Sequence, residues 1–267
     1  MAALADRFGR ARLFYPGGEV LMFGGAFDAG EPEQDRPYEV IEGIAIIPIQ
    51  GTLVQKLGTL HPYSGMTGYN GIRANLALAL ADESVTAIAF DIDSPGGEVA
   101  GCFDLADAIY AARGIKPIWA VLTESAYSAA YALASACDRV TVPRTGGTGS
   151  VGVIVAHVDL SRALADAGLT VTLITYCERK ADGNEFQPLA DEAYDRIKAD
   201  VGTVGELFVA TVARNRGLSV AKVRGTQATT FLGAASVAAG FADAVMAPDA
   251  ALRALLQALE QQPYAEA

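Results

Sequence analysis

The sequence is poor in the residues that build disulfide frameworks, metal sites and nucleic-acid surfaces. It has three cysteines and two histidines in 267 residues, and the cysteines do not form a C-x-x-C pair. An odd number of cysteines without that spacing indicates neither a disulfide framework nor a zinc site, and it fits a reducing compartment. With 20 basic against 31 acidic residues, the net charge is -11, so the positive surface that nucleic-acid phosphates require is missing.

Long apolar runs are also missing. Residues 1–25 contain no stretch of the length that a signal sequence or a membrane span needs, so we expect a soluble intracellular protein without a membrane span. Residues 25–37 are rich in glycine, proline and charge, as linkers are. We therefore expect an N-terminal arm and linker over 1–37, a main domain over 38–248, and a C-terminal amphipathic helix or tail over 249–267.

Apolar β-rich runs alternate with helical patterns along most of the chain. Hydrophobic residues make up 51% of the sequence, which is enough for one substantial core. Strands that alternate with helices predict an α/β fold with a mainly parallel sheet and flanking helices. The expected strands are 43–53, 85–93, 117–122, 149–158 and 171–176, and the expected helices are 69–84, 99–114, 128–137, 160–168 and 191–216. The C-terminal amphipathic stretch is expected either to cap the core or to contact another subunit.

Two junctions rich in glycine or serine are candidates for chemistry. In "DSPGGEVAG", Pro95, Gly96 and Gly97 end a strand and are expected to open a helix. Their N–H groups could face a ligand oxygen, or the segment could be a plain turn. In "TESAYSAAY", Ser128 stands between a strand and a helix. There it could cap the helix, as Ser125 also could, or it could act as a nucleophile at a strand-to-helix corner.

A serine nucleophile needs a general base, and the chain offers few. His61 lies in a loop, and His157 ends an apolar run, where a structural hydrogen bond is the favoured interpretation. Lys180 follows an expected strand on the side of the sheet where sites usually form, although by itself it would be read as a solvated loop charge. In "TGGTGSVGV", Ser150 could hold a buried amine or belong to a turn.

Together, these segments resemble the ordered motifs of the signal peptide peptidase A family of serine-lysine peptidases. The likeness is carried by "DSPGGEVAG", "SAYSAAY", "ASACDRV", "TGSVGV" and "RKADGN". The stretches "GTLVQKLGTLHPYSGMTGYNGI" and "GIKPIWA" resemble the phage branch of that family in particular, the head-maturation proteases. The resemblance covers about residues 38–246 and does not extend over 1–36.

The resemblance implies a catalytic dyad. Ser128 falls on the nucleophile of the family, and Lys180 falls on its general base. Ser150 falls on the hydroxyl that orients the lysine amine.

The resemblance also implies the surroundings of that dyad. Gly97 and the N–H of Ala129 fall on the oxyanion site, while Gly96 and Gly152 fall on substrate-binding positions. Many members of the family have Gly-Gly after the nucleophile, where this chain has Ala129 and Ala130, and that difference bears on the width of the pocket. We expect a Gly97→Val substitution to leave folding largely intact and to lower turnover.

The family likeness implies a crotonase/Clp-like superfold, shared with enoyl-CoA hydratases, and a reaction without metal or cofactor. It implies scaffold, portal or capsid proteins as substrates, a ring-shaped homo-oligomer, and a place in the host cytoplasm or inside the procapsid. Three alternatives are a signal-peptide or quality-control peptidase of the same family, an acyl-CoA enzyme and an inactive assembly module. The acyl-CoA enzyme would use carboxylates in place of Ser128 and Lys180, and the module would bind capsid proteins without turnover.

Overall fold

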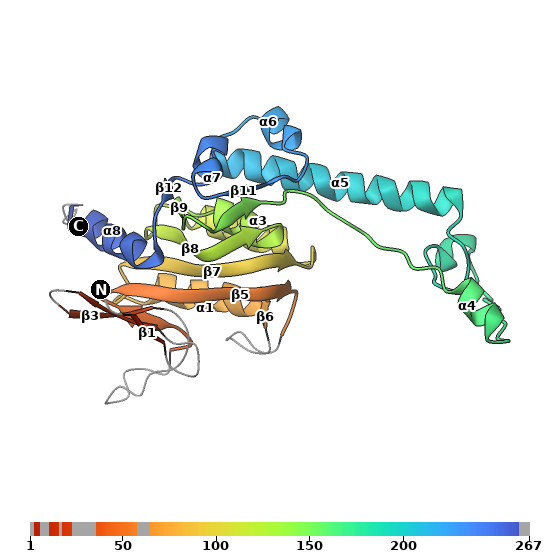
Figure 1. Ribbon diagram of the computed structural model, residues 1–267, viewed down its shortest axis with the longest axis horizontal. Coiled ribbons are helices and arrows are strands. Elements are labelled where there is room, and N and C mark those ends of the chain that lie inside the picture. Colours follow the sequence, from red (N-terminus) through yellow and green to blue (C-terminus); the bar gives the residue numbers. More distant parts are fainter. Residues whose placement is uncertain (1–2, 6–10, 16–17, 23–35, 58–64, 262–267) are drawn as a thin grey trace. The chain divides into compact units, whose positions relative to one another are not determined.

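The computed structural model describes residues 3–5, 11–15, 18–22, 36–57 and 65–261 (Figure 1). The chain divides into two compact units: the first is formed by 1–151 and 211–267, and the second by 152–210. Within the described residues, no helix combines the length and the apolarity that crossing a membrane requires.

The first unit is built on a mostly parallel sheet, as the alternating pattern predicts. Its central strands lie in the order β10 (Gly147–Gly149), β8 (Ile118–Tyr127), β7 (Ala87–Gly97) and β5 (Ile44–Val54), and each neighbouring pair is parallel. Both β7 and β8 are buried along most of their length, as expected of a parallel sheet covered on both faces.

Shorter strands complete the sheets of the first unit. The edge strands β4 (Glu39–Ile41) and β11 (Thr230–Leu232) are antiparallel to their neighbours, whereas β6 (Met66–Gly68), β9 (Arg139–Val142) and β12 (Ala244–Val245) pair in parallel. A separate antiparallel sheet contains β1 (Ala3–Ala5), β2 (Ala11–Tyr15) and β3 (Gly18–Met22).

Helices make the crossovers that parallel strands require. These are α1 (Tyr69–Ala81), α2 (Cys102–Ala111) and α3 (Ala129–Ser135). Every residue of α3 is buried, and this helix contacts both β7 and β8. The expected helices 69–84, 99–114 and 128–137 are thus confirmed with shorter bounds. The short helices α6 (Val220–Gly225) and α7 (Ala234–Ala239) lie between α5 (Asp191–Arg216) and the C-terminal helix in the sequence.

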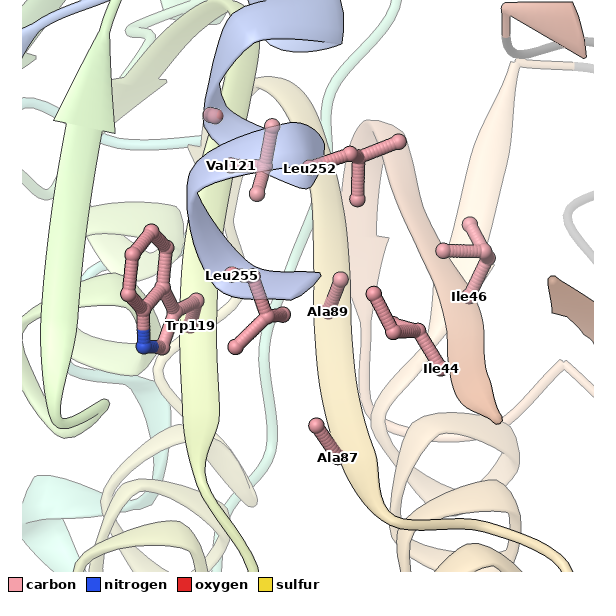
Figure 2. Close-up of a cluster of buried hydrophobic side chains, with 9 residues drawn as sticks. Ile44, Ile46, Ala87, Ala89, Trp119, Val121, Leu252 and Leu255 are labelled. Atoms are coloured by element: carbon pink, nitrogen blue, oxygen red, sulfur yellow. The ribbon is translucent and has the colours of Figure 1, made fainter. Parts of the chain in front are cut away.

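The C-terminal helix α8 (Pro248–Gln261) caps the core of the first unit (Figure 2). Its Leu252 and Leu255 are buried against one face of the central strands. The strand residues in this cluster are Ile44, Ile46, Ala87, Ala89, Trp119 and Val121. They alternate along their strands, so the intervening residues face the opposite side of the sheet. The C-terminal stretch was predicted either to cap the core or to contact another subunit. Capping the core accounts for the apolar face of α8.

The second unit contains helices but no strand across residues 152–210. It comprises α4 (Ser161–Asp166), the 3₁₀ helix η1 (Glu178–Ala181) and the first part of α5 (Asp191–Arg216). The expected strands 149–158 and 171–176 are therefore wrong: β10 ends at Gly149, where the first was expected to begin, and residues 171–176 form no strand. Ile154 and Ile174 are 93% and 94% exposed. An apolar run becomes a strand only where neighbouring strands pair with it, and these two runs have no such neighbour.

We predict that Leu255→Ala lowers the free energy of unfolding by about 2–5 kcal/mol, because it empties a fully buried position. Urea unfolding of the purified chain measures the change. The matched control is Leu78→Ala in α1, where the side chain is 47% exposed and the expected loss is below about 1 kcal/mol. Equal losses for the two variants would contradict the packing of α8 on this sheet.

Candidate active site

The candidate residues of the first unit follow the carboxyl ends of three parallel strands. Gly97 ends β7, Ser128 follows β8 and Ser150 follows β10. Because β7, β8 and β10 are neighbours, their ends meet at one edge of the sheet (Figure 1). Ligand sites in parallel sheets form at this edge. Three segments that are far apart in the sequence are therefore brought together.

Ser128 occupies a strained corner between β8 and α3. Its backbone has φ 52° and ψ -126°, a region that residues with a side chain rarely adopt. Its N–H donates to the Gly149 carbonyl at 2.9 Å, and its own carbonyl accepts from the N–H of Tyr131. The side chain makes no capping hydrogen bond to the helix. Helix capping therefore does not explain this serine, and strain of this kind gathers at functional positions.

Gly96 approaches this corner more closely than any side chain would allow. A Cβ atom built on Gly96 would lie 2.7 Å from the Ser128 Cβ, 2.8 Å from the Tyr127 carbonyl oxygen and 3.0 Å from the Ala129 nitrogen. The φ of Gly96 is +103°, which also favours glycine. The backbone of β7 is thus in direct contact with the candidate nucleophile.

Gly97 has a different neighbour. It pairs with Leu53 of β5, and a Cβ atom at Gly97 would fall on the Leu53 carbonyl group. The expectation that Gly97→Val leaves folding largely intact is therefore wrong, since the valine side chain would separate the paired strands β5 and β7. The helix expected directly after the glycines is also corrected, because "SPGG" ends β7 and α2 begins only at Cys102.

Ala129 and Ser150 lie beside Ser128. Ala129 is buried and is the first residue of α3, where N–H groups have no acceptor within the helix. Ser150 follows Gly149, whose carbonyl accepts the Ser128 N–H, and it also has a positive φ, of 56°. The Ser150 N–H donates to the Thr229 carbonyl at 3.2 Å. A serine hydroxyl, a glycine backbone and the start of a helix are therefore in reach of one another.

The remaining predicted residues, Lys180 and Gly152, belong to the second unit. Lys180 lies in η1 and is exposed. Its backbone N–H donates to the Cys177 carbonyl at 3.0 Å. The pairing of Lys180 with Ser128 stays a prediction, as does the contact of Gly152 with substrate.

Of the two histidines, the structure describes His157 and not His61. His157 hydrogen-bonds through Nε2 with the Asn184 carbonyl at 2.9 Å, in agreement with the structural role that the sequence favoured. His61 lies outside the described residues.

Asp91 is a buried carboxyl residue in β7, a few residues before Gly96 and Gly97, and the sequence analysis did not identify it. Asp91 is 2% exposed and accepts hydrogen bonds from the Gln50 amide, at 3.1 Å, and from the Thr123 hydroxyl. Burial raises the pKa of Asp91 to about 7, with a smaller contribution from Asp93, while the two hydrogen bonds act in the opposite direction. The available signal was an aspartate within the apolar run "AIAFDI", which a buried strand tolerates only when it has partners.

The sequence model of peptidase family S49 matches residues 111–262, more than half of the chain and a range that includes Ser128 and Lys180. The chain belongs to peptidase family S49. Among its relatives, the head-tail preconnector protein GP5 of Enterobacteria phage P21 is 42% identical over 96% of this chain. The capsid assembly protease C of Escherichia phage lambda is 41% identical over 87% of it.

Other relatives of this chain are more distant. The chloroplastic serine protease SPPA of Arabidopsis thaliana is 25% identical over 76% of this chain and 30% of its own length. The chain spans about half of each phage relative, 53% in both cases. The motifs predicted a peptidase family and, within it, a likeness to phage proteins. Both predictions are confirmed, by the match to family S49 and by the two phage relatives.

We predict that the stability of this S49 family member depends on pH through Asp91. The folded-state pKa of about 7 lies above the ordinary value of 3.8, so folding favours the protonated form. The stabilisation is fully present below about pH 4 and is lost as the pH rises to about 7, with a slope of up to about 1.4 kcal/mol per pH unit. The Asp91→Asn variant has no carboxyl group at this position, so its stability does not fall in this way as the pH rises.

Urea unfolding between pH 4 and 8 tests this dependence. The free energy of unfolding of Asp91→Asn, relative to wild type, should increase with pH up to about 7 and then level off. Leu78→Ala, which leaves every carboxyl group in place, should show a difference from wild type that does not vary with pH. A flat difference for Asp91→Asn would show that Asp91 is ionised in the folded protein throughout this range.

Proposed function

We propose that this chain is a serine endopeptidase in which Ser128 is the nucleophile and Lys180 the general base. Its proposed substrates are scaffold, portal or capsid proteins of a maturing phage head. The observation that carries the proposal is the strained Ser128 corner, with the backbone of Gly96 and the helix start at Ala129 against it. Membership of the S49 family supports peptide hydrolysis, and the name of the phage lambda relative supports the setting.

In the proposed reaction, the uncharged amine of Lys180 takes the proton of the Ser128 hydroxyl. The Ser128 oxygen then attacks a peptide carbonyl carbon, and the electron pair of the C=O bond moves to the carbonyl oxygen. The N–H groups of Gly97 and Ala129 stabilise that oxyanion, and Ser150 holds the amine. When the intermediate collapses, the C–N bond breaks and the Lys180 ammonium gives its proton to the leaving nitrogen, which releases the amine product and leaves an acyl-enzyme. Water then attacks the acyl carbon, with its proton passing to Lys180 and from there back to the Ser128 oxygen. The N–H of Gly96 already has an acceptor in Ser94, at 3.1 Å, which supports Gly97 as the oxyanion donor.

We extend the proposal to the architecture and the assembly. The mostly parallel sheet with flanking helices is compatible with a crotonase/Clp-like superfold, with residues 38–248 as the peptidase domain. Gly96 and Gly152 line the bound peptide. The active form is a homo-oligomeric ring that acts in the host cytoplasm or inside the procapsid, without metal or cofactor.

We predict that Ser128→Ala and Lys180→Ala each lower proteolysis by at least about a thousandfold, because each removes one half of the proposed dyad. Lys180→Arg should fail as well, since a guanidinium group does not give up its proton at neutral pH. The measurement is cleavage of co-expressed scaffold and portal proteins, followed on gels.

Matched controls for the dyad are Ser161→Ala in α4 and Lys198→Ala in α5, which remove the same groups from other positions. Both should retain the activity of the wild type. Full activity of Ser128→Ala would refute the proposed nucleophile. An active Lys180→Arg enzyme would show that another base serves Ser128, and His157 would be the next residue to substitute.

We predict that Gly96→Ala lowers turnover by at least about a hundredfold, because the added methyl group would push Ser128 and Ala129 away from β7. The control is Gly114→Ala, which shares a positive φ, +84°, but has open space around the new methyl group. The control should cost about 1 kcal/mol of stability without affecting turnover. Peptide hydrolysis and urea unfolding of both variants separate backbone strain from displacement of the site.

A further inference from the structure

Ser94 is a buried hydroxyl residue two positions before Gly96 in β7. It is 1% exposed, so a substrate cannot touch it. Its Oγ accepts the Gly96 N–H at 3.1 Å and donates to the Gly51 carbonyl of β5 at 2.6 Å. One side chain therefore links the end of β7 to the neighbouring strand through two hydrogen bonds.

These two hydrogen bonds lie where the regular pairing of β7 is interrupted on both sides. Toward β5, the register shifts between Gln50 and Thr52, so that Gly51 is left out of the pairing. Toward β8, the register shifts between Ile92 and Ser94. At such irregularities the ladder hydrogen bonds are lost locally, and the backbone needs other partners. The Ser94 hydroxyl supplies a partner to one N–H and to one carbonyl group.

The position of Gly96 decides the geometry at Ser128. Ser94 pairs with Ala126, two residues before Ser128, and the Gly96 backbone is in contact with the Ser128–Ala129 corner. The hydroxyl of Ser94 orients the peptide plane that carries the Gly96 N–H. The next peptide plane carries the Gly97 N–H, and only the φ and ψ rotations of Gly96 separate the two planes. Fixing the first plane therefore limits the direction of the second.

We propose that Ser94 is a positioning residue for oxyanion stabilisation: it holds the Gly96 peptide so that the Gly97 N–H points at the carbonyl oxygen of the bound substrate. This inference rests on the proposed function and adds a residue to it. Ser94 acts through Gly96 and Gly97 and does not contact the substrate. Preorganised donors of this kind contribute most when they cannot turn away.

The test compares Ser94→Ala with Ser94→Thr and with a control. Ser94→Ala removes both hydrogen bonds without adding bulk, and kcat should fall by about 10- to 100-fold with little change in KM. Ser94→Thr keeps the hydroxyl and should recover most of the lost kcat. The control is Ser135→Ala, since Ser135 is also fully buried and also makes two hydrogen bonds, with Ala132 and Asn215. It should lower stability without lowering kcat.

A peptide aldehyde separates positioning from general loss of structure. The Ser128 oxygen adds to the aldehyde carbon, the π electrons move to the carbonyl oxygen, and the serine proton passes to the base. The new oxyanion needs the Gly97 N–H, whereas simple peptide binding does not. Ser94→Ala should therefore weaken aldehyde binding by about the same factor as kcat/KM and leave the affinity for the cleaved peptide product unchanged.

The outcomes distinguish this inference from the function on which it rests. If the wild-type protein cleaves no peptide and forms no aldehyde adduct, the proposed function fails. If the wild type is active and Ser94→Ala keeps kcat within about threefold, the positioning role of Ser94 is refuted. An equal loss of kcat in Ser135→Ala, or equal weakening of aldehyde and product binding in Ser94→Ala, would also refute it.

Discussion

The close approach of the end of β7 to the corner between β8 and α3 is the constraint on which the candidate site depends. Gly96 lies so near Ser128 and Ala129 that no side chain fits between them. A contact between two backbones leaves little tolerance, because there is no flexible group that can move aside. Strand pairing, crossover helices and buried hydroxyl groups all contribute to keeping these two segments at this separation.

The strain at Ser128 is offset by the way α3 is anchored. Tyr131, one turn into the helix, is fully buried, stacks on Phe241 at 4.8 Å between ring centroids, and donates its hydroxyl to the Phe241 carbonyl at 2.9 Å. An unusual backbone conformation costs about 1–3 kcal/mol, and burying one aromatic side chain contributes a similar amount. At the other end of α3, Arg113 donates to the last carbonyl groups of the helix, where positive charge is favourable. The corner can therefore stay strained without unfolding.

Buried polar groups in β7 connect the core to the site. Asp91 is held by residues of β5 and β8, and Ser94 joins β7 to β5 a few residues later. In a low-dielectric interior, such groups favour the one arrangement in which all their hydrogen bonds form. They cost free energy in any other register of the strands. The end of β7 is therefore specified by polar contacts as well as by apolar packing.

The sequence by itself determined the features that depend on local pattern. The alternation of apolar runs and helical spacing predicted the parallel α/β sheet, and the order of motifs indicated the peptidase family and the Ser128 corner. Local pattern also predicted strands at 149–158 and 171–176, and these failed because a strand exists only with a neighbour to pair with. The local sequence does not tell which backbone atoms make glycine necessary at Gly96 and Gly97, or which groups bind the Asp91 and Ser94 side chains. Only the tertiary structure decided them, because each depends on an atom of a strand that is distant in the sequence.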